Sequence, residues 1–247
     1  MTIDVFAQYF ADVKDPRQTA KLSYPLYDVL FLSICAIITG CEGWEDIEDF
    51  GKARLSWLQG LGLFKEGLPV HDTIARIISR IEPSALQSSF IRWMQEVVKL
   101  SEGEVVAVDG KRLRSSYARH DRQSAIHMVS AFATANGVVM GQIKTDAKSN
   151  EITAIPDLLN LLDIKGCLIT IDAMGCQHKI TKTIVDKGAD YLIAVKGNQK
   201  RLYESIKAAF ASVDTATGLH IEKGHGRVEA REYHVQDAGD FAEAYPD

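Results

Sequence analysis

The chain has 247 residues, of which 46% are hydrophobic and 25% are charged. This length and composition can bury one large core or two smaller ones, and they exclude an intrinsically disordered chain. The formal net charge of −5 argues against an extended coat on nucleic acid but is compatible with a local basic groove.

The cysteines and the hydrophobic segments limit the kinds of site and the compartment. None of the four cysteines is in a C-x-x-C pair, which argues against a zinc site and favours free thiols in a reducing cytoplasm. The N-terminus carries an acid where a signal peptide would carry positive charge. The apolar run 26–39 is too short to span a bilayer and contains Asp28, so we predict a buried helix and a cytoplasmic protein without a membrane partner.

Residues 1–100 have the pattern of an all-helical domain, because apolar residues recur in them at helical spacing. The segment 68–83, LPVHDTIARIISRIEP, is a compact example. It predicts a helix with Asp72 or Thr73 as its N-cap and Pro83 at its end. The domain is a candidate for DNA binding.

Three polar side chains of this segment each have a functional and a structural interpretation. His71 could be a metal ligand, but a histidine in a turn is the more common case. Arg76 and Arg80 are four apart on the polar face of the helix, where they would either contact phosphates or face solvent. Together with Arg92 they are thin support for DNA binding by this domain.

Residues 101–247 change to the pattern of strands. The segment EVVAVDGKRL runs apolar up to Asp109, and the segment CLITID ends in Asp172 in the same way. A carboxylate at the end of a buried strand is costly unless it is compensated, and a divalent metal is a frequent partner. The alternative is that each Asp caps the turn after its strand. Two such strands together favour a metal-dependent site for phosphoryl transfer.

The order of the elements after Asp109 predicts an α/β fold with a mixed sheet. Two strands joined at Asn136-Gly137 form a hairpin, and alternating helices and strands follow. This order fits three antiparallel strands, further strands added by crossovers, and helices on both faces. The first strand then lies centrally, beside the strand that ends at Asp172, so the two acids could share a metal. That arrangement is the ribonuclease H-like fold.

Motifs over nearly the whole chain resemble those of the H-repeat-associated insertion-sequence transposases. They are, in order, DPRQ, LPVHDTIARIISR, AVDGKRLRSS, AIHMVSAFA, GQIKTDAKSNEITAIPDLLNLLDIKGCLITIDAMGCQ, GADYLIAVKGNQ and GHGRVEAREY. The resemblance implies a DDE transposase with a ribonuclease H-like core, which excises and inserts a DNA element with Mg²⁺ or Mn²⁺ in a two-metal site. By this resemblance, Asp109 and Asp172 match the first two acids of the triad and are both catalytic and metal-binding.

Positive charge gathers near the first of these acids. Seven Lys and Arg, against two Asp, lie between Lys111 and Lys148. The residues that we predict to contact DNA are Lys111, Arg112, Arg114, Lys144, Lys148, Lys196 and Asn198. For Lys148 with its neighbour Asn150, a phosphate contact and plain loop structure are equally compatible. His225 and Arg227 could position DNA, although polar loop residues are more often only solvated.

The third acid departs from the family pattern. The resemblance implies a Glu on a helix well downstream, and no such segment precedes Asp247. The nearest candidate is Glu229 in GHGRVEAREY, a segment that predicts a turn leading into a strand. We therefore expect residues 101–247 to form a catalytic core that is incomplete at its C-terminus, with weak metal binding and little or no DNA cleavage.

Three functions stay open at this point. The chain could be a DDE transposase, another ribonuclease H-like nuclease that reuses the same two acids, or a non-enzymatic transposase relic that only binds DNA. The long motif from Lys144 to Gln177 favours the first, and the missing third acid favours the last for this particular chain. The expected partners are the ends of a DNA element, a DNA target, and further copies of the chain in a homo-oligomer.

Overall fold

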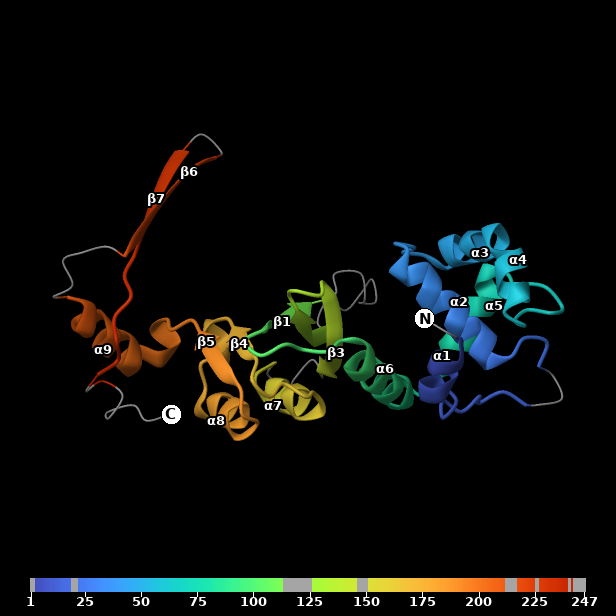
Figure 1. Ribbon diagram of the computed structural model, residues 1–247, viewed down its shortest axis with the longest axis horizontal. Coiled ribbons are helices and arrows are strands. Elements are labelled where there is room, and N and C mark those ends of the chain that lie inside the picture. Colours follow the sequence, from blue (N-terminus) through green and yellow to red (C-terminus); the bar gives the residue numbers. More distant parts are fainter. Residues whose placement is uncertain are drawn as a thin grey trace, which may run out of the picture. The chain divides into compact units, whose positions relative to one another are not determined.

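The chain divides into two compact units, Met1–Lys99 and Leu100–Asp247. The structure is a computed structural model, and the residues that it describes are 3–18, 22–112, 126–145, 151–211, 217–224, 227–239 and 241. Figure 1 labels their helices and strands.

The elements described in the first unit are all helices. They are α1 (Ile3–Phe10), α2 (Leu26–Ile38), α3 (Trp44–Ala53), α4 (Leu55–Gly60), α5 (His71–Ile78) and α6 (Pro83–Val97). Phe6 and Phe10 share one face of α1 because they lie four residues apart, and their rings stack with centroids 4.3 Å apart. Phe6 also meets Phe31 of α2 and Trp93 of α6 edge to face. This aromatic cluster joins three helices into one core.

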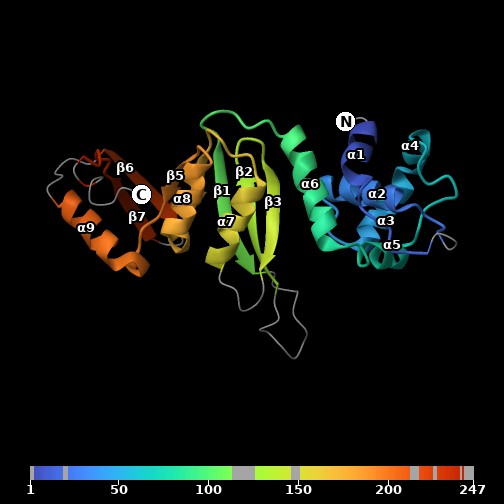
Figure 2. The same ribbon diagram turned by 90° about the horizontal axis from the view of Figure 1, so that it is seen from below.

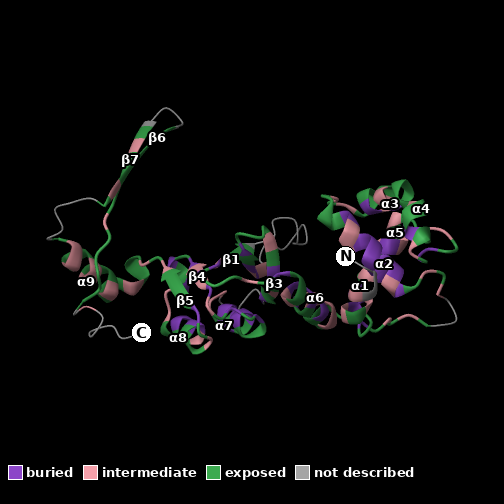
Figure 3. Cartoon of the chain, viewed as in Figure 1, coloured by how far each residue is buried: buried purple, intermediate pink, exposed green. Residues whose placement is uncertain are grey.

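Helix α2 is the most buried helix of this unit, as the buried residues in Figure 3 show. Its buried residues lie between Leu26 and Ala36, which confirms the buried helix that the run beginning at Leu26 predicts, while Ile37 and Ile38 at its C-terminus are exposed. Within the described ranges we find no helix with the length and hydrophobicity to cross a membrane.

Asp28 is a carboxylate inside this core, with 7% of its surface exposed. Its Oδ2 accepts a hydrogen bond of 2.7 Å from the backbone N–H of Phe64. Phe64 is itself buried and has a φ of +51°, in the left-handed region that side chains rarely adopt. Burial raises the pKa of Asp28, and the Phe64 N–H opposes that rise because it favours the charged form. The hydrogen bond therefore both satisfies Asp28 and holds a strained turn.

The boundaries of α5 differ from those that the sequence predicts. The helix begins at His71, and neither Asp72 nor Thr73 caps it. Glu48 of α3 takes that role from another helix, because its Oε2 accepts the His71 backbone N–H at 2.7 Å. Pro83 begins α6 rather than ending α5, since proline fits the first helical position, where no N–H is needed.

The second unit contains a mixed sheet. Its elements are β1 (Val105–Arg112), β2 (His127–Ala133), β3 (Val138–Thr145), α7 (Glu151–Leu161), β4 (Leu168–Ile171), η3 (Ala173–Gly175), α8 (His178–Asp186), β5 (Asp190–Ile193), η4 (Gly197–Gln199), α9 (Lys200–Phe210), β6 (Gly218–Gly224) and β7 (Arg227–Tyr233). Five strands have the order β3-β2-β1-β4-β5. The first three are antiparallel, and β4 and β5 are parallel to β1. The predicted mixed sheet and central first strand are thus confirmed.

The hairpin between β2 and β3 turns at the predicted place. Gly137 has a φ of +67°, which glycine adopts without strain. The Asn136 side chain donates a hydrogen bond of 2.8 Å to Glu104 Oε1, just before β1. The turn is thereby tied to the start of the central strand.

Helices α7 and α8 pack on the same face of the sheet, as Figures 1 and 2 both show. Along β1 the buried Val106 and Val108 alternate with less buried residues, so one face of the strand forms the core. The prediction of helices on both faces is wrong for the part of the chain that the structure describes. The crossovers from β3 to β4 and from β4 to β5 run in the same direction, and right-handed connections then place both helices on one side.

Replacement of Asp28 by Ala should lower the free energy of unfolding by about 2 kcal/mol, because the buried N–H of Phe64 loses its acceptor. Chemical denaturation measures this loss. Asp28→Asn keeps an oxygen acceptor in nearly the same volume and should lose clearly less. Equal losses in the two variants would show that the hydrogen bond to Phe64 does not hold this turn.

The contact between His71 and Glu48 predicts a stability that depends on pH. The Lys52 ammonium and the His71 N–H groups lower the pKa of Glu48 to about 2. The hydrogen bond that the His71 ring donates to the Glu48 carboxylate raises the pKa of His71. A raised histidine pKa stabilises the fold fully below the unfolded value of about 6.5, and this contribution is lost as the pH rises through the folded value. Glu48 stays ionised over that range, so its own contribution is lost only on acidification toward about pH 2.

We therefore expect the thermal midpoint of the wild-type chain to fall as the pH rises from 6 through the raised pKa of His71. His71→Gln should flatten this dependence between pH 6 and 9. His220→Gln, at an exposed position of β6, is the matched control and should keep the slope of the wild-type chain. A slope that persists in His71→Gln would contradict the assignment.

Candidate active site

Asp109 and Asp172 lie at the same level on neighbouring strands. In the parallel pair of β1 and β4, Val108 is opposite Ile171, and the next residue is an Asp in both cases, Asp109 within β1 and Asp172 directly after β4. Paired strands are about 4.8 Å apart. Val108 and Ile171 are buried under the helices, and the alternation of side chains turns both carboxylates toward the opposite face. Both Asp residues are exposed there.

Asp109 differs in one respect from what the sequence predicts. The strand β1 does not end at Asp109 but continues to Arg112, and Asp109 itself pairs with Ser130 of β2. The carboxylate is therefore exposed on an open strand and not buried at the end of one. No described donor forms a hydrogen bond with the Asp109 side chain, so both of its oxygens can bind a ligand.

Asp172 has the capping role that the sequence gives as one of two interpretations. It is the N-cap of η3, and its Oδ1 accepts a hydrogen bond of 3.0 Å from the Met174 backbone N–H. This bond fixes the carboxylate and leaves the second oxygen for a ligand. Gly175 allows the tight turn that follows, since a Cβ at this position would overlap Ile171 Cγ2.

The loop after β5 is tied to the loop after β4. The Asn198 side chain donates to the Ala173 carbonyl at 2.7 Å, and the Gln199 side chain donates to the Cys176 carbonyl at 2.7 Å. The residue that Asn198 contacts comes directly after Asp172. The sequence predicts a DNA contact for Asn198 and does not predict these two bonds to the loop after β4. Two neighbouring amide side chains after a strand indicate a polar loop, but nothing in the local sequence indicates which carbonyl groups accept their hydrogen bonds.

Lys111 and Lys144 form a basic row beside the acids. Met128 of β2 is opposite Lys111 of β1 on one side and Lys144 of β3 on the other. The two lysines are thus two strand spacings apart, or about 10 Å. Lys111 is two residues from Asp109, so its side chain points to the same open face. Both lysines are exposed.

The other predicted DNA contacts are less informative. Lys196 is exposed at the N-cap position of η4. Arg112 ends β1 at the register position opposite His127. The remaining predictions on Arg114, Lys148, Asn150 and His225 fall outside the described residues.

Glu151 is an acid that lies beside the neighbour of Asp109 in space, and the sequence does not indicate this proximity. Its carboxylate lies against Gly110, where a Cβ would overlap it, and its Oε1 is 3.4 Å from His127 Nδ1. Gly110 is the neighbour of Asp109 and therefore presents the opposite face of β1. Glu151 thus packs on the helix-covered face and does not join the two exposed carboxylates.

Glu229 is not brought together with Asp109 and Asp172. It lies in β7, opposite Glu222 of β6, as the expected strand after a turn. The Arg231 side chain donates a hydrogen bond of 2.7 Å to its Oε2. Among the described residues, no three His, Cys, Asp or Glu side chains are grouped closely enough to hold a metal ion. The exposed site therefore has two acids within the described part of the chain.

Two known families match this sequence. The family described as "Transposase DDE domain" matches residues 100–245, and the family described as "DDE_Tnp_1-associated" matches residues 7–94. The boundary between the two matches agrees with the division of the structure into units at Lys99 and Leu100.

Several relatives in Escherichia coli carry the word transposase in their provisional names. YncI of strain O157:H7 is 50% identical over 236 residues, which are 94% of this chain and 60% of that protein. The H repeat-associated protein YhhI of strain K12 is 49% identical and matches 97% of this chain over 65% of its own length. YbfD of strain K12 is 48% identical and is matched over 97% of both chains. The chain thus spans less than two thirds of the first two of these relatives and nearly all of the third.

Solved structures are only distantly similar. The piggyBac transposase synaptic complex with hairpin DNA has a TM-score of 0.39 and 11% identity, over 90% of this chain and 53% of that one. A likeness at this level is too weak to assign a fold.

Replacement of Asn198 by Ala should lower the free energy of unfolding in the absence of DNA by about 1 kcal/mol, because the hydrogen bond to Ala173 is lost. Thermal or chemical denaturation measures the loss. Lys196→Gln alters an exposed side chain of the same loop and should leave stability unchanged. If Asn198→Ala is as stable as the wild-type chain, the amide is free for DNA and the structural role is wrong.

Proposed function

Because the chain belongs to the family of DDE transposases, we propose that it carries out the DNA strand cleavage and strand transfer by which an insertion sequence moves. The observation that carries this proposal is the register of the parallel pair of β1 and β4, with Asp109 and Asp172 side by side on one exposed face. The order and the directions of the five strands support a ribonuclease H-like core.

The two carboxylates fit a hard divalent cation. Asp109 offers two oxygens and Asp172 offers one that is free of the cap to Met174. Mg²⁺ is commonly held by one or two carboxylates together with substrate phosphates, so Asp109 and Asp172 are the residues that would hold Mg²⁺ or Mn²⁺. Such a cation neutralises charge on a scissile phosphate and lowers the pKa of an attacking water or hydroxyl group.

The residues around the acids would position the DNA. Lys111 and Lys144 place two ammonium groups on the face that carries Asp109, and ammonium groups bind backbone phosphates without regard to sequence. The bonds of Asn198 and Gln199 to the loop after β4 would keep Asp172 in place while DNA binds. Such rigidity matters because an error of about 1 Å in a catalytic group can reduce the rate by about 100-fold.

A second candidate function is DNA binding without cleavage. It is favoured by the site itself, which has two acids and no third among the described residues. Two acids alone would bind a cation weakly, so we propose that DNA phosphates supply further ligands and that cleavage by this chain is slow. On this proposal, the affinity for Mn²⁺ should increase when DNA is bound.

Titration with Mn²⁺, followed by its paramagnetic resonance, tests the site directly. We expect weak binding that tightens with an oligonucleotide and that is lost in Asp109→Asn and in Asp172→Asn. Any Mg²⁺- or Mn²⁺-dependent nicking of plasmid DNA should fall by at least about 100-fold in the same variants. Glu229→Gln is the matched control and should change neither measurement, because Arg231 already binds that carboxylate.

The two candidate functions then differ in outcome. DNA binding without nicking in the wild-type chain would favour the second candidate. Metal binding or nicking that survives both Asp substitutions would remove Asp109 and Asp172 from the site.

A further inference from the structure

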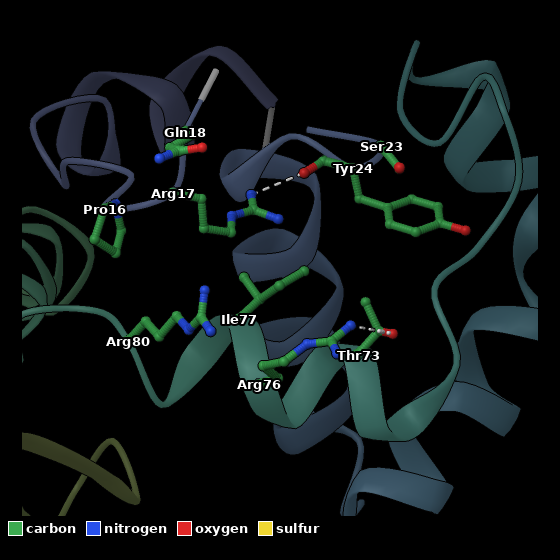
Figure 4. A pocket seen from close by; sticks show the side chains of 9 residues that line it. All are labelled: Pro16, Arg17, Gln18, Ser23, Tyr24, Thr73, Arg76, Ile77 and Arg80. Carbon is green, nitrogen blue, oxygen red and sulfur yellow. Dashed lines mark hydrogen bonds between the residues drawn. The ribbon is translucent and has the colours of Figure 1, made fainter. Parts of the chain in front are cut away.

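The first unit contains a cavity of about 690 Å³ that none of the roles above uses. Figure 4 shows it between the loop that carries Arg17 and Tyr24 and the helix α5 that carries Ile77. Its lining includes three arginines, Arg17, Arg76 and Arg80, and no Asp or Glu. A cavity of this size is in the range of about 300–1,000 Å³ that small-molecule sites occupy.

Arg17 lines the cavity, and three hydrogen bonds hold its guanidinium group. Its guanidinium bonds to both carboxylate oxygens of Asp15, at 2.8 and 2.6 Å, and to the carbonyl of Tyr24 at 2.8 Å. The hydrogen bond from Arg17 lowers the pKa of Asp15 below its ordinary value, so the two charges neutralise each other. Arg17 therefore shapes the loop and contributes little net charge.

Arg76 and Arg80 supply the net positive charge. Arg76 donates a hydrogen bond of 3.2 Å to Thr73 Oγ1, which directs its side chain along α5. Neither arginine forms an ion pair with a described acid. The acids nearest in sequence bond elsewhere, since Glu82 accepts from Ser84 and Asp72 lies 3.6 Å from the His71 ring. Two guanidinium groups thus face the cavity without compensation.

The remaining lining suits a ligand that is only partly charged. Ile77 is buried and is drawn between Arg17 and Arg76 in Figure 4, and Tyr24 also lines the cavity. Guanidinium groups match the oxygens of a phosphate with parallel hydrogen bonds. An aromatic ring and an aliphatic side chain offer surfaces for a sugar or a base. The combination is that of a nucleotide site and not of a site for a bare oxyanion.

We propose that this cavity binds a phosphodiester group of DNA together with its neighbouring nucleotide. Arg76 and Arg80 bind the phosphate, and Ile77 and Tyr24 contact the nucleotide. This site is separate from Asp109 and Asp172 and needs no divalent cation, although its choice of ligand rests on the proposed DNA function. It gives the helical unit a defined contact with DNA.

Fluorescence anisotropy of the full chain with labelled oligonucleotides, in the presence of EDTA, tests the proposal. The double variant Arg76→Gln, Arg80→Gln should bind at least about 10-fold more weakly. The slope of log K against log [salt] should become shallower by about 0.9, because the two arginines bind a single phosphate and each lost phosphate contact removes about 0.9 from the slope. Arg54→Gln removes one positive charge from an exposed position of the same unit and should keep the slope of the wild-type chain.

Further measurements separate the outcomes. Arg76→Lys, Arg80→Lys keeps the charge but not the paired donors and should recover part of the affinity. Competition by inorganic phosphate or by a nucleoside monophosphate distinguishes a site for free phosphate from one for DNA, and only a site for DNA resists both at millimolar concentration. Competition by an acidic peptide but not by DNA would overturn the proposal in favour of a protein ligand.

The proposal is overturned if the double variant folds with the thermal midpoint of the wild-type chain and keeps its affinity and salt slope. It is also overturned if Arg54→Gln loses as much as the double variant. EDTA removes any divalent cation from Asp109 and Asp172, so this assay reports on the two arginines, whereas the Mn²⁺ titration reports on the two acids. Loss of the proposed cavity site is therefore distinct from loss of the proposed metal site.

Discussion

The parallel pairing of β1 with β4 is the constraint on which the candidate active site depends. Its register sets Val108 opposite Ile171, and both side chains are buried under the helices. Because side chains alternate along a strand, the same register turns Asp109 and Asp172 to the open face. A slip of one residue in either strand would bury one carboxylate and expose one core side chain. The strand register that forms the hydrophobic core therefore also brings the two acids side by side.

Much of this arrangement can be predicted from local sequence. Apolar runs mark β1 and β4, Asn136-Gly137 marks the hairpin, and the order of the elements predicts a central β1. What escapes prediction depends on contacts between distant residues. The N-terminus of α5 receives its acceptor from Glu48, 23 residues earlier, so the local candidates for a cap are misleading. Likewise, the face chosen by α7 and α8 follows from the direction of the crossovers and from no single residue.

In the candidate active site, too, residue types can be predicted from local sequence, whereas contacts between distant residues cannot. The types of residue at Asp109 and Asp172 point to carboxylate chemistry, whereas the partners of Asn198 and Gln199 appear only when two loops meet. Exposure is also hard to predict, because β1 continues beyond Asp109 on a face that no described helix covers. Glu229 is an acid in a family-like motif, yet it accepts a hydrogen bond from Arg231 on the same strand. A motif therefore identifies a candidate residue, and only the fold decides which atoms it meets.

The net charge of −5 changes how DNA binding by this chain should be understood. A uniform attraction to DNA is absent, so affinity has to come from local basic groups. Lys111 and Lys144 on the sheet, and Arg76 and Arg80 at the cavity, are such groups in two different units. A chain that neutralises few phosphates has a shallow salt dependence, in which each contact is a large share of the total. The loss of one or two arginines should therefore change a large share of the salt dependence of this protein. In a strongly basic chain the same loss would change only a small share.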